Sequence, residues 1–328
     1  MMDTEAFDMP LEKVHKLTSD MKEAAKTLSR LEARYVVSLY YRMQEYRIAT
    51  SAMIKKHQES GEPHSLISSL MDDMRVFENE IKKGLEIFAS NDPVGRWSMS
   101  VCGIGPVIAA GLLAHIDIER ACTAGHVWSF AGLNPAVEWG KGEKRPWNAA
   151  LKVICWKAGQ SFVKVSGRDK DVYGKIYKVR KAYEVEKNEK KMYADQAAAK
   201  IKGNKIGKET VAYKFYSDGL LPPAHIQQRA ERYAVKLFLS HWHHVAYWVH
   251  YGTEPPKPYP IGILNHAHEV DVPSIGKCWD CCSREAAGKN SDVALYLKTH
   301  QVLYTKKMAQ CQSCKQDRHL VIAIRQNP

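Results

Sequence analysis

Hydrophobic positions near the start of the chain recur with helical spacing. Apolar residues seven apart, Val14, Met21, Leu28 and Tyr35, interleave with Leu17, Ala24 and Leu31. This a/d pattern of about three heptads predicts one helix over residues 10–60. Gly61-Glu62-Pro63 breaks it, and the apolar stripe that follows predicts a second helix over 65–88. The pair is typical of an antiparallel hairpin within one chain or a coiled coil between two copies, and both interpretations stay open.

The rest of the chain is patterned mainly for helices. Helices are expected over 149–165, 171–200 and 224–251, the last opened by Pro222-Pro223 and closed by Gly252. Strand signal is weak, except that residues 321–324 predict one strand. We therefore expect a mainly α fold.

Changes in pattern along the chain divide this fold into three parts. Residues 1–92 are expected to form the helical hairpin or coiled coil, and 93–260 a helical core. The last part, 261–328, is rich in loops and cysteines.

A glycine turn opens the helical core. Gly103-Ile104-Gly105 precedes Pro106 and an apolar run that contains Ala109, Leu112 and Leu113. Glycines allow a phosphate to approach the backbone, and the helix that starts at Pro106 presents free N–H groups and the positive end of its dipole. This order predicts a helix-hairpin-helix that holds a DNA phosphate through Gly103, Ile104 and Gly105 without reading sequence. A plain turn is the alternative.

Charge favours a polyanionic partner. The net charge is +12 and the pI about 9.2, and the excess of Lys and Arg is concentrated between Lys141 and Lys208. Nucleic acid is the expected polyanion, and an anionic membrane surface is the alternative. No apolar run is long enough to span a membrane and no apolar signal core opens the chain, so we expect a cytoplasmic protein that does not enter membranes.

Two motifs identify a family. Gly103-Ile104-Gly105-Pro106-Val107 is followed by Phe130-Ala131-Gly132-Leu133-Asn134-Pro135, a Gly/Lys loop and a basic helix. This order resembles the C-terminal transposase domain of the insertion-sequence group named for elements 110, 116 and 902. Members of that group are RNA-guided serine recombinases. The segment 224–236 is similar to the family's closing helix, and the N-terminal helices resemble its coiled coil.

The chain departs from the family in two respects. Members begin with an RNase H-like domain that carries four acidic catalytic residues, and no such domain precedes the expected coiled coil here. Members also place a nucleophilic serine shortly after the Ala-Gly-Leu-x-Pro motif, whereas residues 136–147 contain no serine. A serine recombinase needs a hydroxyl that attacks the DNA phosphate. Ser129 and Ser161 lie outside that loop, so we expect DNA binding without this chemistry.

Cations and tryptophans of the core are candidate DNA contacts. The loop after the second motif carries Lys141, Lys144 and Arg145, with Trp139 and Trp147 as candidates for stacking on bases or for packing in the core. Lys152 lies on the next helix, and Arg229, Arg232 and Lys236 share one face of the helix over 224–251. Lys175, Lys178 and Lys181 are spaced along one side of the helix, and we interpret them either as contacts to a DNA backbone or as a solvated helix face. The histidines at 241, 243, 244 and 250 are interpreted as core or surface residues.

The C-terminal cysteines predict a metal site. Cys278 and Cys281 form one Cys-x-x-Cys knuckle, and Cys311 and Cys314 form another. Two knuckles supply the four thiolates of a structural zinc site, so we expect a small zinc ribbon-like module with Zn as cofactor. Cys282 could replace Cys281 as a ligand. The alternative to a zinc site is that these cysteines are reduced or redox-active thiols.

Three functions follow from these patterns. The first is a DNA-binding, transposase-like protein of a mobile element or phage that acts in transposition, recombination or their regulation. The second is an active recombinase that uses another nucleophile or a partner subunit. The third is an RNA-binding or scaffolding protein. A homo-oligomer formed through the N-terminal helices is expected.

Overall fold

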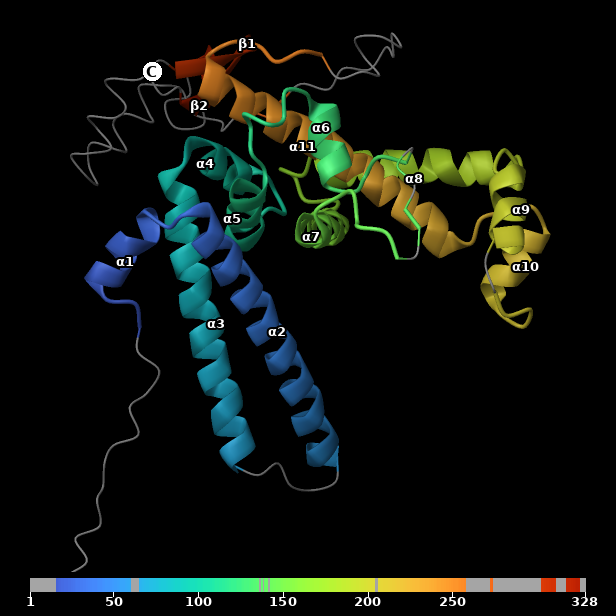
Figure 1. The fold of residues 1–328 in the computed structure, drawn as a ribbon, viewed down its shortest axis with the longest axis horizontal. Helices are drawn as coiled ribbons and strands as arrows, with labels where there is room; N and C mark the ends of the chain where they lie inside the picture. The colour runs from blue at the N-terminus through green and yellow to red at the C-terminus, as the bar shows by residue number, and fades with distance from the viewer. Residues whose placement is uncertain are drawn as a thin grey trace, which may run out of the picture. The chain divides into compact units, whose positions relative to one another are not determined.

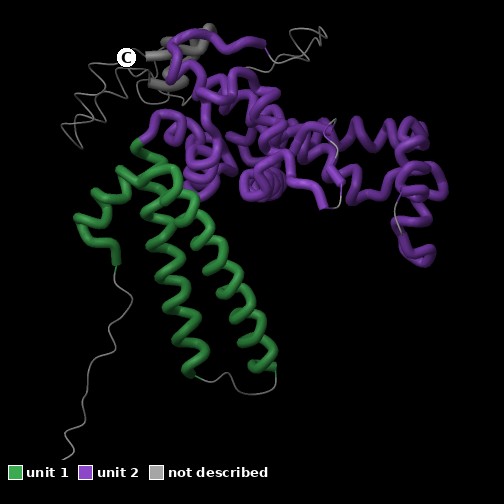
Figure 2. Tube along the Cα trace, viewed as in Figure 1, with its two compact units in different colours: residues 1–91 green, residues 92–328 purple. Residues whose placement is uncertain are grey.

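The computed structural model is mainly helical and falls into two compact units, residues 1–91 and 92–328 (Figures 1 and 2). It describes residues 16–59, 65–135, 137, 139–140, 142–203, 206–257 and 272–273, together with the backbone of 302–310 and 317–324. Within these ranges no helix is long and apolar enough to cross a membrane.

The first unit contains three helices, α1 (Ser19–Lys26), α2 (Arg30–Glu59) and α3 (Ser65–Asn91). The single helix predicted over residues 10–60 is wrong, because the chain is interrupted between Lys26 and Arg30. A reciprocal cap causes the break: the Ser29 N–H donates to the Glu32 carboxylate, and the Glu32 N–H donates to the Ser29 hydroxyl. This capping box starts α2 as a new helix.

The packing of α2 also differs from the predicted heptad seam. Ala33 and Val37 are buried, whereas the seam residues Leu31 and Tyr35 are largely exposed. The Arg47 guanidinium on α2 binds the Glu78 carboxylate on α3 and ties the two long helices together. The two long helices therefore combine buried apolar residues, among them Ile54 of α2 and Ile81 and Leu85 of α3, with a cross-helix ion pair.

The second unit is organised around the long helix α11. Its helices are α4 (Pro93–Ser100), α5 (Pro106–His115), α6 (Ala124–Phe130), α7 (Ala149–Val165), α8 (Tyr173–Glu189), α9 (Ala194–Gly203), α10 (Val211–Ser217) and α11 (Pro223–Tyr251). Helices α4, α6, α7 and α8 all pack against α11 (Figure 1). The centre of this core is aromatic: Phe238 of α11 contacts Trp97, Phe162 and Tyr173.

The helix predicted over 171–200 is two helices in the structure. It ends after Glu189, and Lys191 adopts a left-handed backbone conformation with a φ of 55°. The Asn188 side chain bonds the N–H and the carbonyl of Leu221, which lies far along the chain. These tertiary bonds fix the end of α8 at a point where the local sequence is still helix-forming.

The C-terminal segment contributes two antiparallel strands, β1 (Val302–Gln310) and β2 (Asp317–Ile324), paired from Val302 opposite Ile324 to Gln310 opposite Asp317. Residues 321–324, for which the sequence predicts a strand, lie within β2. The cysteines 278, 281, 282, 311 and 314 lie outside the described residues. Among the residues that are described, no group of three or more His, Cys, Asp or Glu side chains is placed to hold a metal ion.

Candidate nucleic-acid interface

The glycine turn joins α4 to α5, and its first half is held against α7. Gly103 has a φ of 97°, and a Cβ placed on it would lie 3.1 Å from a Val165 methyl carbon and 3.3 Å from a Phe162 ring carbon. The Ser161 hydroxyl donates to the Gly103 carbonyl. Ile104 is buried. Gly103 is thus required by backbone conformation and by packing, a role that the sequence pattern does not reveal.

The second half of the turn is open. Gly105 is the N-cap of α5 in an extended conformation, makes no side-chain capping bond, and a Cβ placed on it would meet nothing within 4 Å. Pro106 follows as the first helical residue. The first turn of α5 therefore offers backbone N–H groups and the positive end of the helix dipole to an anion.

The loop between the second motif and α7 folds on itself around Trp139. The indole N–H of Trp139 donates to the Glu143 carbonyl at 2.8 Å, and the Gly140 N–H donates to the Glu143 carboxylate. The Arg145 guanidinium lies 5.1 Å from the Trp139 ring centroid, and the Trp139 and Trp147 rings meet edge to face. Trp139 remains 41% exposed, so it is accessible to a ligand. Lys144 is exposed on the same loop, and Lys141 lies outside the described residues.

Trp147 and Lys152 form a second pair of this kind. The Lys152 ammonium lies 4.3 Å from the Trp147 ring centroid. Gly132 of the second motif makes room for this ring, because a Cβ on Gly132 would lie 2.8 Å from Trp147. The motif glycine therefore positions a tryptophan beside a cation, which explains its use in this fold.

Helix α11 brings a third pair to the same place. The Trp128 indole N–H donates to the Lys236 carbonyl at 2.9 Å, and the Lys236 ammonium lies 4.6 Å from the Trp128 ring centroid. Trp128 was not identified from the sequence, since nothing around it distinguishes it from a core tryptophan. We use the term tryptophan–cation surface for one set of residues: Trp128, Trp139, Trp147, Arg145, Lys152, Arg232 and Lys236.

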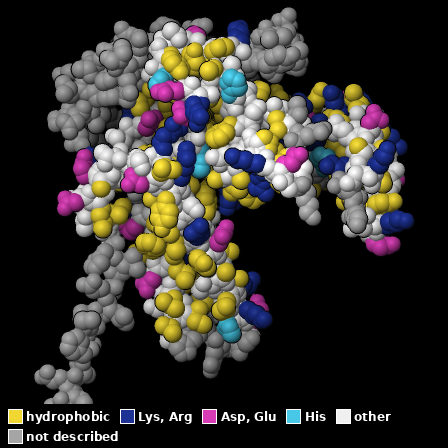
Figure 3. Space-filling view, viewed as in Figure 1, with side chains coloured by type: hydrophobic (Ala, Val, Ile, Leu, Met, Phe, Trp, Pro, Cys, Tyr) yellow, Lys and Arg dark blue, Asp and Glu magenta, His cyan; other side chains and the backbone are white. Residues whose placement is uncertain are grey.

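The cations of this surface repel one another. Partial burial, and then the positive charges of Arg232 and Arg145, lower the pKa of Lys152. Burial and the charge of Arg232 likewise lower the pKa of Lys236. The loop, α7 and α11 thus bring Arg145 and Arg232 close enough to disfavour the charged form of Lys152, and Arg232 close enough to disfavour that of Lys236. Figure 3 shows Lys and Arg side chains lying among hydrophobic side chains over the second unit.

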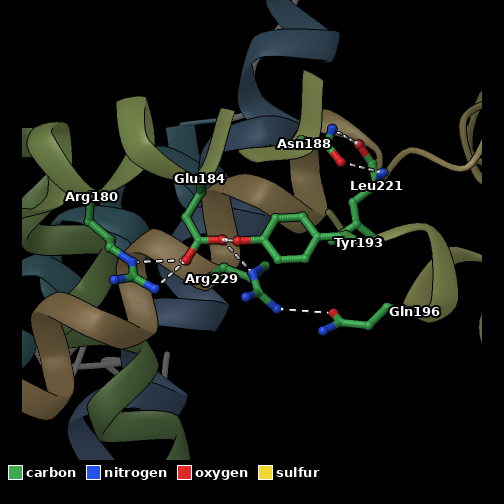
Figure 4. Close-up of polar contacts among 7 residues, drawn as sticks. All are labelled: Arg180, Glu184, Asn188, Tyr193, Gln196, Leu221 and Arg229. Carbon is green, nitrogen blue, oxygen red and sulfur yellow. Dashed lines mark hydrogen bonds and ion pairs between the residues drawn. The ribbon is translucent and has the colours of Figure 1, made fainter. Parts of the chain in front are cut away.

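Arg229, which the helical pattern places with Arg232 and Lys236, is engaged elsewhere. Its guanidinium binds the Glu184 carboxylate at 2.7 Å and the Gln196 amide oxygen at 3.1 Å (Figure 4). It also lies over the Tyr193 ring. The structure therefore brings Arg145, Lys152, Arg232 and Lys236 together and assigns Arg229 to an internal network.

The other candidates occupy different environments. The Ser129 hydroxyl accepts a hydrogen bond from the Asn134 amide. His241 bonds the Tyr173 hydroxyl and His243 bonds the Ala121 carbonyl, and burial lowers the pKa of His243. Both histidines are buried, in agreement with their interpretation as core residues. Lys175 and Lys178 are exposed on α8.

Comparison with known proteins gives one match. Residues 97–173 match the model of a transposase family described as IS116/IS110/IS902. The matched segment begins in α4, contains the glycine turn, Trp128, Trp139, Trp147 and Lys152, and ends at Tyr173. No curated protein and no solved structure matches the chain.

Proposed function

From the transposase-family match of residues 97–173, we propose that this chain is a DNA-binding protein of transposase descent. It acts in transposition or recombination, or in their regulation, for a mobile element or phage. The observation that carries the proposal is the tryptophan–cation surface, where Lys152 lies over the Trp147 ring and Lys236 over the Trp128 ring, and where burial and the charge of Arg232 lower the pKa of both lysines. A polyanion relieves this repulsion, and DNA is the substrate of the matched family's activity.

The surface and the open end of the glycine turn lie at two positions along α7. Lys152 is in its first turn, whereas Ser161, which bonds the Gly103 carbonyl, is about 14 Å further along the helix axis. Nine residues turn a helix by about 180°, so the two positions lie on opposite sides of α7. We therefore propose two separate phosphate contacts, neither of which reads base edges.

We further propose that the chain does not perform the serine chemistry of the family. Residues 136–147 contain no serine, the Ser161 hydroxyl donates to a backbone carbonyl, and Ser129 bonds Asn134. With supercoiled plasmid we expect binding but no covalent protein–DNA adduct after denaturation. An adduct that maps to a hydroxyl of this chain would contradict the proposal and favour a recombinase that uses another nucleophile.

Removing two cations should reduce affinity for duplex DNA in a salt-dependent way. Each phosphate contact contributes about 0.9 to the slope of log affinity against log salt concentration. Lys152→Gln combined with Lys236→Gln should therefore make that slope shallower by about 2. Fluorescence anisotropy of labelled duplex over a range of salt concentrations measures it.

Lys190→Gln, which removes one positive charge away from the tryptophan–cation surface, is the control for this experiment. The Lys190 ammonium is already paired with the Glu186 carboxylate on the exposed end of α8. Its removal should leave the slope unchanged. Equal slopes for the double variant and the control would contradict the DNA interface, and so would preferential binding of RNA at physiological salt.

We also propose a structural zinc ion in the C-terminal segment. Cys311 and Cys314 belong to residues 311–316, which connect β1 and β2, and Gln310 pairs with Asp317 at the end of this hairpin. A Cys-x-x-Cys knuckle in a hairpin connection supplies two ligands of a zinc ribbon, and Cys278 and Cys281 supply the other two. Metal analysis of the purified protein should find one zinc per chain, and none after replacing both Cys278 and Cys311 by serine.

A further inference from the structure

Helix α7 carries a solvent-facing strip that combines a large aromatic side chain with cations. Trp156 is 54% exposed and Val153 is 49% exposed. Lys152 and Lys164 are exposed as well, and the Lys157 ammonium lies 5.8 Å from the Trp156 ring centroid. At 100° per residue, these five side chains occupy less than half of the helix circumference. The strip is continuous with the tryptophan–cation surface, because Lys152 belongs to both.

The core of the second unit does not need this strip. The opposite side of α7 buries Leu151, Ile154, Cys155, Ala158 and Phe162 against its neighbours. Trp156 makes no contribution of that kind, since half of its surface is in water. Trp156 lies four residues, just over one helical turn, after Lys152, which we propose to contact DNA. An exposed indole at this position indicates a ligand that covers its ring.

The surroundings of Trp156 specify the chemistry of this ligand. Lys152 and Lys157 lie within about one turn of Trp156, and Lys164 follows about 12 Å further along the same side of the helix, so the occupant combines a flat apolar face with negative charge. Nucleotides have this composition, with a base that stacks on indole and a phosphate that meets the ammonium groups. In a duplex the base faces are covered by their neighbours. An indole can stack only on a base that is unpaired or displaced.

We infer that Trp156 is a stacking platform for an unpaired nucleobase, with Lys152 and Lys157 on the adjoining phosphates. This inference rests on the proposed DNA-binding function and adds a substrate class to it: single-stranded or locally opened nucleic acid beside the duplex contact. Val153 extends the apolar area on the same strip. A single strand engaged there continues from the duplex held at Lys152.

The experiment compares Trp156→Ala and Trp156→Phe with the unmodified full-length chain. Stacking on one base changes affinity by about tenfold or more. We expect Trp156→Ala to bind labelled oligothymidine about tenfold more weakly and to bind duplex DNA as before. Trp156→Phe should retain most of the affinity, because a phenyl ring still stacks. Oligouridine in place of oligothymidine shows whether RNA or DNA is the preferred strand.

Val179→Ala is the matched control, since Val179 is an exposed apolar residue on α8. It should leave all affinities unchanged. Unchanged binding of oligothymidine by Trp156→Ala would overturn the inference. If Trp156→Ala changes the sedimentation coefficient of the protein but not its affinity for oligothymidine, the strip is a contact between copies of the chain, and the inference is overturned as well. Failure of the unmodified chain to bind duplex DNA would contradict the proposed function. The inference about Trp156 is tested by a different measurement, the comparison of oligothymidine binding between Trp156→Ala and the unmodified chain.

Discussion

Replacing Glu184 by alanine should lower the free energy of unfolding by about 3 kcal/mol, because it leaves two partly buried guanidinium groups without their partner. The Glu184 side chain is 1% exposed. It accepts from Arg180, from Arg229 and from the Tyr193 hydroxyl, the last at 2.6 Å (Figure 4). These bonds join α8 to α11 and to the residue before α9. Urea denaturation measures the loss.

Glu186→Ala is the control for this prediction. Glu186 is two residues away on the same helix and pairs with Lys190, but both side chains are more than 60% exposed. Exposed pairs contribute less than about 1 kcal/mol. An equal loss for the two variants would show that the network around Glu184 contributes no more than a surface ion pair.

The same network predicts how stability depends on pH. Burial raises the pKa of Glu184, but the hydrogen bonds from Tyr193, Arg229 and Arg180 outweigh it, and the pKa lies below the ordinary value of 4.5. A carboxyl whose pKa is lowered by folding stabilises the protein above its unfolded-state pKa. This contribution should therefore be complete at neutral pH and disappear as the pH falls below about 4.5, and Glu184→Ala should lack it.

The network also positions a small separate cluster of helices. Tyr193, Ala197, Leu221 and Ile226 form a core of their own at the far end of α8 and α11. Tyr193 is bonded to Glu184, Gln196 to Arg229, and Leu221 to Asn188 (Figure 4). Hydrogen exchange in α9 and α10 should accelerate in Glu184→Ala more than in the rest of the second unit.

The sequence predicts those features of this fold that depend on local pattern. The helix over 149–165 and the helix over 224–251 agree with α7 and α11 within one residue, because both have clear boundary signals: Asn148 caps the first, and Pro222-Pro223 and Gly252 bound the second. The transposase-family resemblance is confirmed for residues 97–173. It could be predicted because the two motifs that carry it are short and continuous in the sequence.

Features that depend on tertiary contacts could not be predicted in this way. The break before α2 is an exception, because the Ser29–Glu32 capping box is local and has the Ser-x-x-Glu signature, although the heptad pattern continues through it. Helical spacing puts Arg229 with Arg232 and Lys236, but only the folded chain shows Glu184 and Gln196 beside it. The convergence of Trp128, Trp147 and Lys152 likewise arises from the packing of α6, the loop and α7 around α11.

The two glycines of the turn should differ in what they contribute: Gly103 to the stability of the fold and Gly105 to DNA binding. Gly103→Ala should lower the free energy of unfolding by about 2 kcal/mol, because a φ of 97° is strained for alanine and the added Cβ would crowd Val165 and Phe162. Gly105→Val should cost less than about 1 kcal/mol, since its backbone is extended and open. Thermal or urea denaturation distinguishes the two variants.

For affinity to duplex DNA the order should be reversed, with the larger loss in Gly105→Val and the smaller in Gly103→Ala. A valine side chain at position 105 stands before the free N–H groups of α5, and losing one charge-assisted hydrogen bond to a phosphate weakens binding by about tenfold. Folded Gly103→Ala should bind duplex with an affinity close to that of the unmodified chain, because Gly103 faces α7. Gly203→Val is the control, since the position of its Cβ is equally open. If Gly105→Val binds DNA as Gly203→Val does, the turn is a packing element alone, and the tryptophan–cation surface must hold the duplex without it.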